Sequence, residues 1–129
     1  MITVRSRKSL DQLCKDLEQA IADNGFSVMV MHDLQAKLKA KGVTLEHTCR
    51  IYEVCNPQQA KAVLDRDLAI STVLPCRISL YDKDGEFELA TLEPTQQLGP
   101  FACPDLEPIA KEVEDRLHCI LTAAASGAR

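Results

Sequence analysis

Two cysteines in short motifs are the residues best placed to do chemistry. Cys55 comes directly before Asn56-Pro57, a pair typical of a helix start, with asparagine as the cap and proline in the first turn. The positive end of a helix dipole favours a thiolate, so this position could hold a nucleophile, a redox thiol or a ligand-binding thiol. The alternative is a small buried residue at a strand end, because free cysteine is among the most buried residue types. For Asn56 itself, a helix cap is favoured over a catalytic role.

The second motif is Leu74-Pro75-Cys76, which leads into a predicted strand. Its proline removes one hydrogen-bond donor where the strand begins. If this strand lies beside the strand that ends at Cys55, the two thiols converge and could form a reversible disulfide or hold a soft ligand. Core packing is the alternative for Cys76, because it shares one strand face with the apolar residues that follow it.

The other cysteines and the histidines give weaker signals. Cys14 falls on the apolar side of a predicted helix and is expected in the core, whereas Cys103 lies in a proline-rich connection and could be oxidised. His32 or His47 could supply a base if the fold brings it to Cys55, with a surface position as the alternative. The six cysteines form no CxxC pair, so no metal site is predicted, and no cofactor is predicted either.

Motifs of established catalytic and binding chemistry do not occur in the sequence. There is no phosphate-binding GxxxxGK or GxGxxG, no GxSxG and no HExxH. The segment DKDGE at residues 82–86 is similar to a calcium loop but lacks the third ligand before its glycine and the distal glutamate, so a hairpin turn is predicted. Because no complete catalytic constellation is present, the sequence leaves open whether the chain is an enzyme.

Composition and charge narrow the class of protein. The 129 residues suit one domain, and 46% hydrophobic with 26% charged residues is typical of a globular protein. A formal net charge of −4 and the lack of an aromatic platform argue against nucleic-acid binding. No apolar run is long enough to cross a bilayer, and no secretory signal is expected at the N-terminus. With its six cysteines expected to stay reduced, the chain is predicted to be cytoplasmic.

Apolar periodicity and capping residues predict the elements that must position the two motifs. This order of elements predicts a two-layer α+β domain with a mostly antiparallel sheet and helices packed on it. A single domain is expected over residues 1–122, followed by a frayed tail at 123–129. Residues 69–73 are expected to be extended or loop, and 93–104 irregular. The predicted strands cover 2–5, 26–31 and 47–54 and the hairpin 76–92, and the predicted helices begin at Ser9, Asp33, Asn56 and about residue 105, the last running to 122.

The motifs in this order resemble a family known as Domain of Unknown Function 302 (DUF302). The resemblance covers about residues 2–122 and implies a small α+β protein that forms homodimers, occurs mainly in bacteria and archaea and has no established enzymatic activity. Glu93 stands where the family pattern has aspartate, and the four cysteines outside the two motifs are additions to it. The resemblance rests on GFSV at 25–28, CNP at 55–57, LPC at 74–76 and Glu93-Pro94, and it singles out Cys55, Asn56, Pro57, Pro75 and Cys76.

The sequence supports three hypotheses about function. A dimeric binding or interaction domain is favoured. The more specific hypothesis is a thiol site at Cys55 and Cys76, with Asn56 beside it, that binds a small ligand or cycles between redox states. Soft-metal or haem binding through cysteine and histidine ligands is the alternative. The expected partners are a second copy of the chain and a small molecule, and neither nucleic acid nor membrane is expected.

Overall fold

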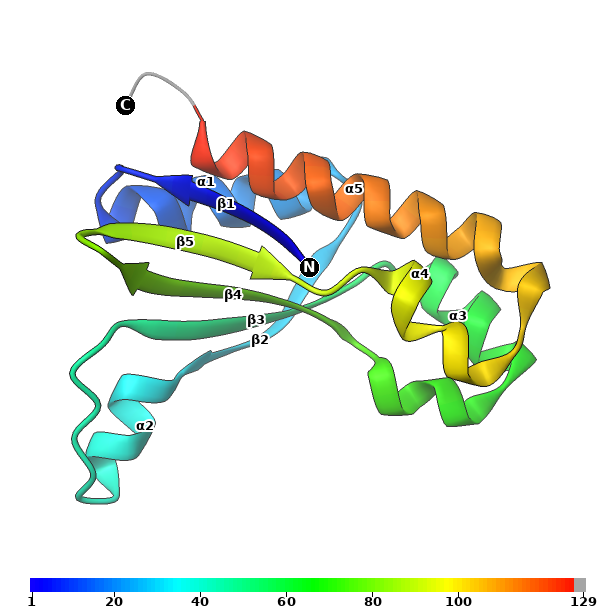
Figure 1. Ribbon diagram of the computed structural model, residues 1–129, viewed down its shortest axis with the longest axis horizontal. Helices are drawn as coiled ribbons and strands as arrows, with labels where there is room; N and C mark the ends of the chain where they lie inside the picture. Colours follow the sequence, from blue (N-terminus) through cyan, green and yellow to red (C-terminus); the bar gives the residue numbers. More distant parts are fainter. Residues whose placement is uncertain (127–129) are drawn as a thin grey trace.

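The protein is built on one five-stranded sheet in which every neighbouring pair of strands is antiparallel (Figure 1). The computed structural model describes residues 1–126. In the order β1-β5-β4-β3-β2, strands β1 and β2 form the two edges of the sheet. The strands are β1 (Ile2–Ser6), β2 (Ser27–Asp33), β3 (Cys49–Cys55), β4 (Cys76–Lys83) and β5 (Glu86–Thr91).

The helices fall into three groups around this sheet (Figure 1). Helices α1 and α5 pack against each other and cover one face of the sheet. Helix α2 extends from one end of the sheet, and α3, α4 and the 3-10 helix η1 gather at the opposite end. The helices are α1 (Leu10–Asp23), α2 (Leu34–Ala40), α3 (Pro57–Arg66), α4 (Pro94–Gln97) and α5 (Glu107–Ala125), with 3-10 helices η1 (Leu68–Val73), η2 (Gly99–Phe101) and η3 (Pro104–Leu106).

Two separate groups of buried apolar side chains hold these layers together. The main core joins α1, α5 and the covered face of the sheet, because apolar residues recur at helical spacing in α1 and α5 and at every second position in the strands. A smaller cluster of Val63, Ile70 and Leu106 joins α3 and η1 to the segment before α5. The fully buried members of the main core include Leu13, Leu17, Ile21, Val54, Ile78, Leu80, Leu89, Leu117, Ile120 and Leu121.

The helix starts predicted at Ser9 and Asp33 are confirmed by their caps. The backbone N–H of Gln12 donates to Ser9 Oγ (3.2 Å), and the N–H of Ala36 donates to Asp33 Oδ1 (3.0 Å). Each bond satisfies one of the N–H groups that have no partner inside the first turn of a helix. After α1 the chain turns at Gly25, whose φ of +78° is a conformation that glycine adopts without steric cost.

The segment at residues 82–86 is a hairpin turn, as predicted. Strands β4 and β5 pair directly through Lys83 and Glu86. Between them Asp84 and Gly85 have φ of 53° and 82°, the pair of positive values that a tight two-residue hairpin requires. Asp84 and Gly85 therefore form the tight turn that joins β4 to β5.

The structure differs from the sequence predictions in its connections. Residues 69–73 lie in a 3-10 helix rather than an extended segment, because Asp67 caps it by accepting from the N–H of Ala69 (2.9 Å). The irregular stretch 93–104 contains one turn of α-helix, α4, started by Pro94. The last helix runs to Ala125, so residues 123–125 of the expected frayed tail are helical. Residues 127–129 of that tail lie outside the described residues.

The predicted fold class is confirmed, because an antiparallel sheet carries helices on one face and at its ends. None of the helices in the described part of the chain combines the length and the apolar character that crossing a bilayer requires.

Candidate functional site

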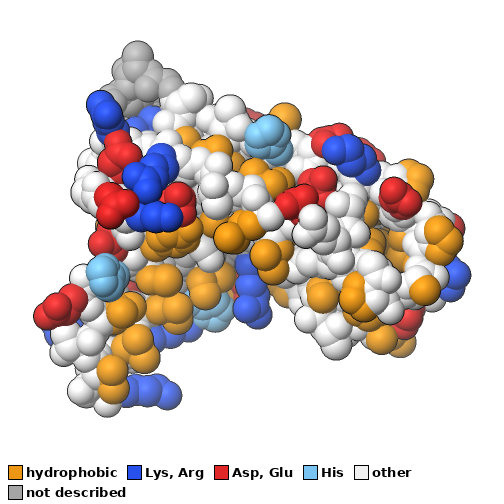
Figure 2. Space-filling model, viewed as in Figure 1, with side chains coloured by type: hydrophobic (Ala, Val, Ile, Leu, Met, Phe, Trp, Pro, Cys, Tyr) orange, Lys and Arg blue, Asp and Glu red, His pale blue; other side chains and the backbone are white. Residues whose placement is uncertain are grey.

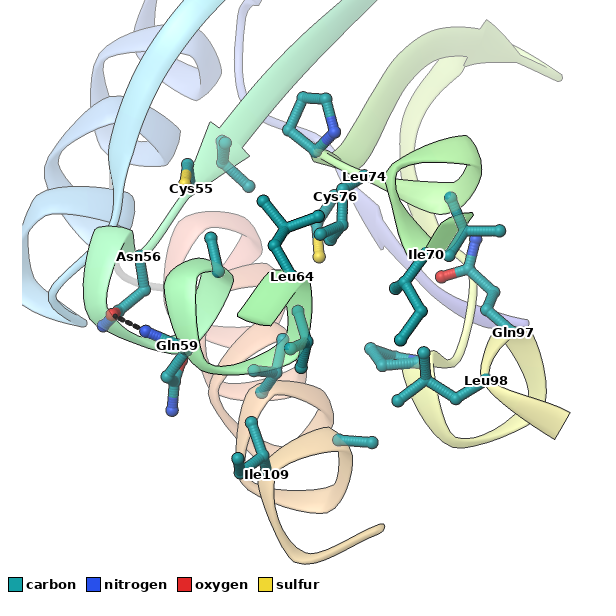
Figure 3. A pocket seen from close by; sticks show the side chains of 18 of the residues that line it. Cys55, Asn56, Gln59, Leu64, Ile70, Leu74, Cys76, Gln97, Leu98 and Ile109 are labelled. Carbon is teal, nitrogen blue, oxygen red and sulfur yellow. Dashed lines mark hydrogen bonds between the residues drawn. The ribbon is translucent and has the colours of Figure 1, made fainter. Parts of the chain in front are cut away.

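A cavity of about 290 Å³ lies at the end of the sheet where α3, η1 and α4 gather (Figure 3). It separates the two apolar clusters, since Val54 and Phe26 of the main core form one wall and Val63 and Ile70 of the smaller cluster form another. The walls come from strands β2, β3 and β4 and from helices α3, η1, α4 and α5. The lining residues are Phe26, Met29, Val54, Cys55, Asn56, Gln59, Ala60, Val63, Leu64, Ile70, Ser71, Val73, Leu74, Pro75, Cys76, Pro94, Gln97, Leu98, Ile109, Ala110 and Val113.

The chemical character of this cavity is apolar and uncharged. None of its lining residues is Asp, Glu, Lys, Arg or His. The polar groups in the wall are the side chains of Asn56, Gln59, Ser71 and Gln97, together with the two thiols. A charged molecule would lose its hydration in this cavity without meeting an opposite charge, and that costs several kcal/mol or more. The walls therefore favour a neutral, largely apolar occupant.

The two motif cysteines both line this cavity. Val54 is the cross-strand partner of Cys76, so Cys55 lies one residue beyond that pair on β3. Figure 3 shows the sulfur of Cys76 within the cavity, facing Leu64 and Ile70, and Cys55 at its edge. Both cysteines are free thiols. The predicted convergence of the two motifs at one place is thus found, without a disulfide between them.

Burial acts against ionisation of both thiols. It raises the pKa of Cys55 above its ordinary value. It raises the pKa of Cys76 to about 11, with a further contribution from the nearby Cys55 thiol. The sequence predicted a lowered pKa at Cys55 from the positive field of the α3 N-terminus, and desolvation produces the opposite direction. Both thiols therefore stay protonated at neutral pH, which makes them poor nucleophiles.

Asn56 is the cap of α3 and also a link between elements. Its Oδ1 accepts from the backbone N–H of Gln59 (3.1 Å), and its Nδ2 donates to the carbonyl of Gly25 (3.2 Å). Arg116 of α5 donates to the neighbouring carbonyl of Asn24 (2.9 Å). The cap prediction is confirmed, and the same side chain ties the start of α3 to the turn between α1 and β2.

Two carboxamide side chains in the cavity wall have unused hydrogen-bonding capacity. Gln59 Oε1 is buried and accepts no hydrogen bond, and Gln97 makes no side-chain hydrogen bond to any residue in the described range 1–126. Figure 3 shows them on opposite sides of the cavity, Gln59 beside Asn56 on α3 and Gln97 beside Ile70. Buried polar groups are nearly always paired, so Gln59 Oε1 is available to a bound molecule, and the half-buried Gln97 side chain can also donate or accept there.

The sequence profile of the family described as "Domain of unknown function DUF302" matches residues 2–124. This chain belongs to the DUF302 family. Its fold is also similar to that of a solved structure, the crystal structure of an uncharacterized conserved protein DUF302 from Bacillus stearothermophilus. That protein is 30% identical to this chain, has a TM-score of 0.90, and the match covers 97% of both chains. Comparison with curated proteins gave no match.

The histidines of this DUF302 chain do not join the cysteines of the cavity. His32 contacts Lys37 and lies 3.7 Å from Glu53, and His47 contacts Asp82 at 3.1 Å. Neither histidine lines the cavity, so the structure places no base beside Cys55. Among residues 1–126, no three His, Cys, Asp or Glu side chains come together as metal ligands.

The remaining cysteines of the DUF302 domain lie apart from the cavity. Cys14 is buried, as predicted, and its Sγ accepts from Arg50 Nη1 (3.3 Å). Cys103 is half-buried, and its thiol donates to the carbonyl of Phe101 (3.3 Å) rather than facing solvent freely. Cys49 is half-buried on β3, and Cys119 is exposed on α5.

Sequence reasoning missed the two glutamines, η1 and α4. Gln59 and Gln97 lie in a helix start and in a segment expected to be irregular, where glutamine is ordinary. Only the placement of α4 and η1 across the end of the sheet gives these residues a common cavity. A bulge between Val28 and Val30 likewise brings Met29 to the cavity rim, and no turn residue in β2 indicated it.

Proposed function

We propose that this protein binds a small, largely apolar molecule in the cavity between its two apolar clusters. The observation that carries the proposal is a cavity of about 290 Å³ whose walls hold no charged side chain. Pockets that enclose organic ligands are mostly apolar with a few placed polar groups, and this volume is at the small end of their range of ~300–1,000 Å³. An apolar ligand here would join the two clusters into one continuous core.

A thiol-based redox or nucleophilic role has less support at this site than binding alone. Burial raises the pKa of both Cys55 and Cys76, and no histidine or carboxylate lines the cavity to take a proton from either. As protonated thiols, the two side chains act as small polarizable contacts for a ligand. The alternative of a soft metal or haem would require cysteine or histidine donors, and the cavity offers only these two thiols.

For the expected homodimer, we propose that two copies of the chain pair through β2, an edge strand of the sheet. This edge strand exposes three successive apolar side chains, Met29 (63% exposed), Val30 (38%) and Met31 (39%). Figure 2 shows hydrophobic side chains gathered over the part of the surface that holds β2, β3 and α2. Exposed apolar edge strands are ready to pair with another strand. Light scattering after size exclusion is expected to give twice the chain mass, and Val30→Lys is expected to give the monomer mass.

The binding proposal is tested with a neutral fluorescent probe, N-phenyl-1-naphthylamine, whose emission rises in apolar surroundings. Ala60→Phe places a ring in the wall of the cavity and should abolish the rise. Ala22→Phe adds the same ring to an exposed position on α1 and should leave the titration unchanged. Equal probe binding by the wild type and both variants would contradict the proposal, and so would no binding by the wild type.

A further inference from the structure

The two unpaired carboxamides distinguish one class of apolar ligand from the others. A purely apolar molecule would leave Gln59 Oε1 buried without a partner, which is costly. An anion would place its charge among walls that hold no cation, and two neutral carboxamides do not replace the hydration it loses. A neutral group that both donates and accepts hydrogen bonds has neither cost, and a hydroxyl is the simplest such group.

We propose that the cavity selects uncharged apolar molecules that carry a hydroxyl group, and that Gln59 and Gln97 recognise this group. The inference rests on the proposed binding function and names its ligand class. Each carboxamide can present either its oxygen or its nitrogen, and a hydroxyl can pair with both. The glutamines lie on opposite sides of the cavity, so a hydroxyl at either end of an elongated ligand reaches one of them (Figure 3).

The state of the thiols and the cap of α3 support the same selectivity. Protonated thiols at Cys55 and Cys76 add no charge to the wall, so the cavity stays neutral at physiological pH. Asn56 holds the backbone N–H of Gln59 and thereby fixes the first turn of α3. The Gln59 side chain therefore projects from a capped helix turn rather than from a mobile loop, which favours a defined hydrogen bond.

A second, neighbouring cavity contains a charged residue, Arg77, that could pair with a negatively charged group. Its volume is about 210 Å³, and it shares the wall from Val73 to Cys76 and the Gln97 side chain with the first cavity. Its lining includes the cation of Arg77 and the hydroxyl groups of Thr72 and Thr91. Arg77 is already paired with Glu53 at 3.4 Å, so this second cavity offers a partly neutralised charge. The expected preference for neutral ligands therefore belongs to the first cavity.

The test compares two ligands of equal chain length, 1-octanol and octanoate, as competitors for the bound naphthylamine probe. The alcohol is expected to displace the probe at least about tenfold more effectively than the carboxylate, because the carboxylate must bury a charge that meets no cation. Gln59→Leu and Gln97→Leu are each expected to weaken alcohol binding several-fold while the probe still binds. Gln58→Leu and Gln96→Leu alter exposed neighbours on the same helices that do not line the cavity, and should change neither ligand.

Failure of this inference and failure of the binding proposal give different results. If the probe binds and Ala60→Phe abolishes binding, the cavity takes ligands. Equal displacement by octanol and octanoate, displacement by neither, or unchanged alcohol binding in both Gln→Leu variants then overturns the selectivity alone. If the probe does not bind the wild type, both proposals fall together.

Discussion

At the scale of single residues, burial makes Cys76 a thiol that holds its proton. Its pKa rises from 9.0 to about 11 in the folded chain. Below pH 9 the folded and unfolded states both carry the proton, so stability does not change through this group. Between pH 9 and about 11 the unfolded chain releases a proton that the folded chain keeps, so stability falls as pH rises.

The loss expected from this thiol is about 2–3 kcal/mol across that interval. Urea unfolding measured at a series of pH values should show a shallower fall for Cys76→Ala than for the wild type, even though the variant is less stable at every pH. Cys119→Ala removes an exposed thiol and is the matched control. Parallel curves for the wild type and Cys76→Ala would show that the Cys76 thiol ionises as freely in the folded chain as in the unfolded one.

Gln59 is a residue whose removal should stabilise the ligand-free protein. Its buried Oε1 accepts no hydrogen bond, and such an unpaired group costs about 1–3 kcal/mol. Gln59→Leu keeps the volume and removes the polar atom, so the free energy of unfolding is expected to rise by about 1 kcal/mol. Denaturant unfolding measures this change, with Gln58→Leu as the control. A variant less stable than the wild type would mean that Gln59 has a structural partner in solution.

The sequence identified the cysteines of the site but not their chemistry. Cys55 and Cys76 stood out because each adjoins a proline motif, and the fold does bring both to one cavity. The predicted lowering of the Cys55 pKa is wrong, because the direction depends on burial among the side chains that line the cavity. Desolvation is a property of the packed structure, and adjacent sequence carries little information about it.

At the scale of elements, α3 depends on Asn56 for both its start and its position. The side chain caps the helix through the N–H of Gln59 and also donates to the carbonyl of Gly25. Asn56→Ala is expected to lower the free energy of unfolding by about 1 kcal/mol or more, since one cap bond alone contributes that much. Thermal or urea unfolding gives this value.

The same substitution should also weaken probe binding, because the first turn of α3 carries Gln59 and Ala60 into the cavity wall. Asp33→Ala is the matched control, since it removes the cap of α2, a helix that does not line the cavity. It should cost similar stability without changing probe binding. If both variants reduce binding equally, the loss reflects general destabilisation rather than the position of α3.

The elements with strong local signals were predicted well, and those without were missed. Helix α1 has a serine cap, an apolar stripe and a terminal glycine, and it forms where expected. The segments η1 and α4 are too short for a helical period to show, and prolines mark only where each can begin or end. Because these two short elements close the cavity, its existence could not be predicted from the sequence.

At the scale of the whole molecule, the cavity lies where two apolar clusters fail to meet. The main core packs α1 and α5 on the sheet, whereas α3 and η1 pack around Val63 and Ile70. A ligand in the cavity would contact both clusters and add buried apolar area between them. Ligand binding should therefore raise the stability of the α3–η1 end of the molecule more than that of the α1–α5 end.

The most direct test of ligand binding in this cavity is a map of backbone amide chemical shifts during titration with 1-octanol. Shifts are expected to concentrate at the end of β3, the first turns of α3, η1 and α4, which supply the cavity wall. The amides of α2 and of the turn at Asp84 and Gly85, at the opposite end of the sheet, should stay unchanged. Shifts confined to the exposed edge strand β2, or no saturable shifts at all, would contradict the account.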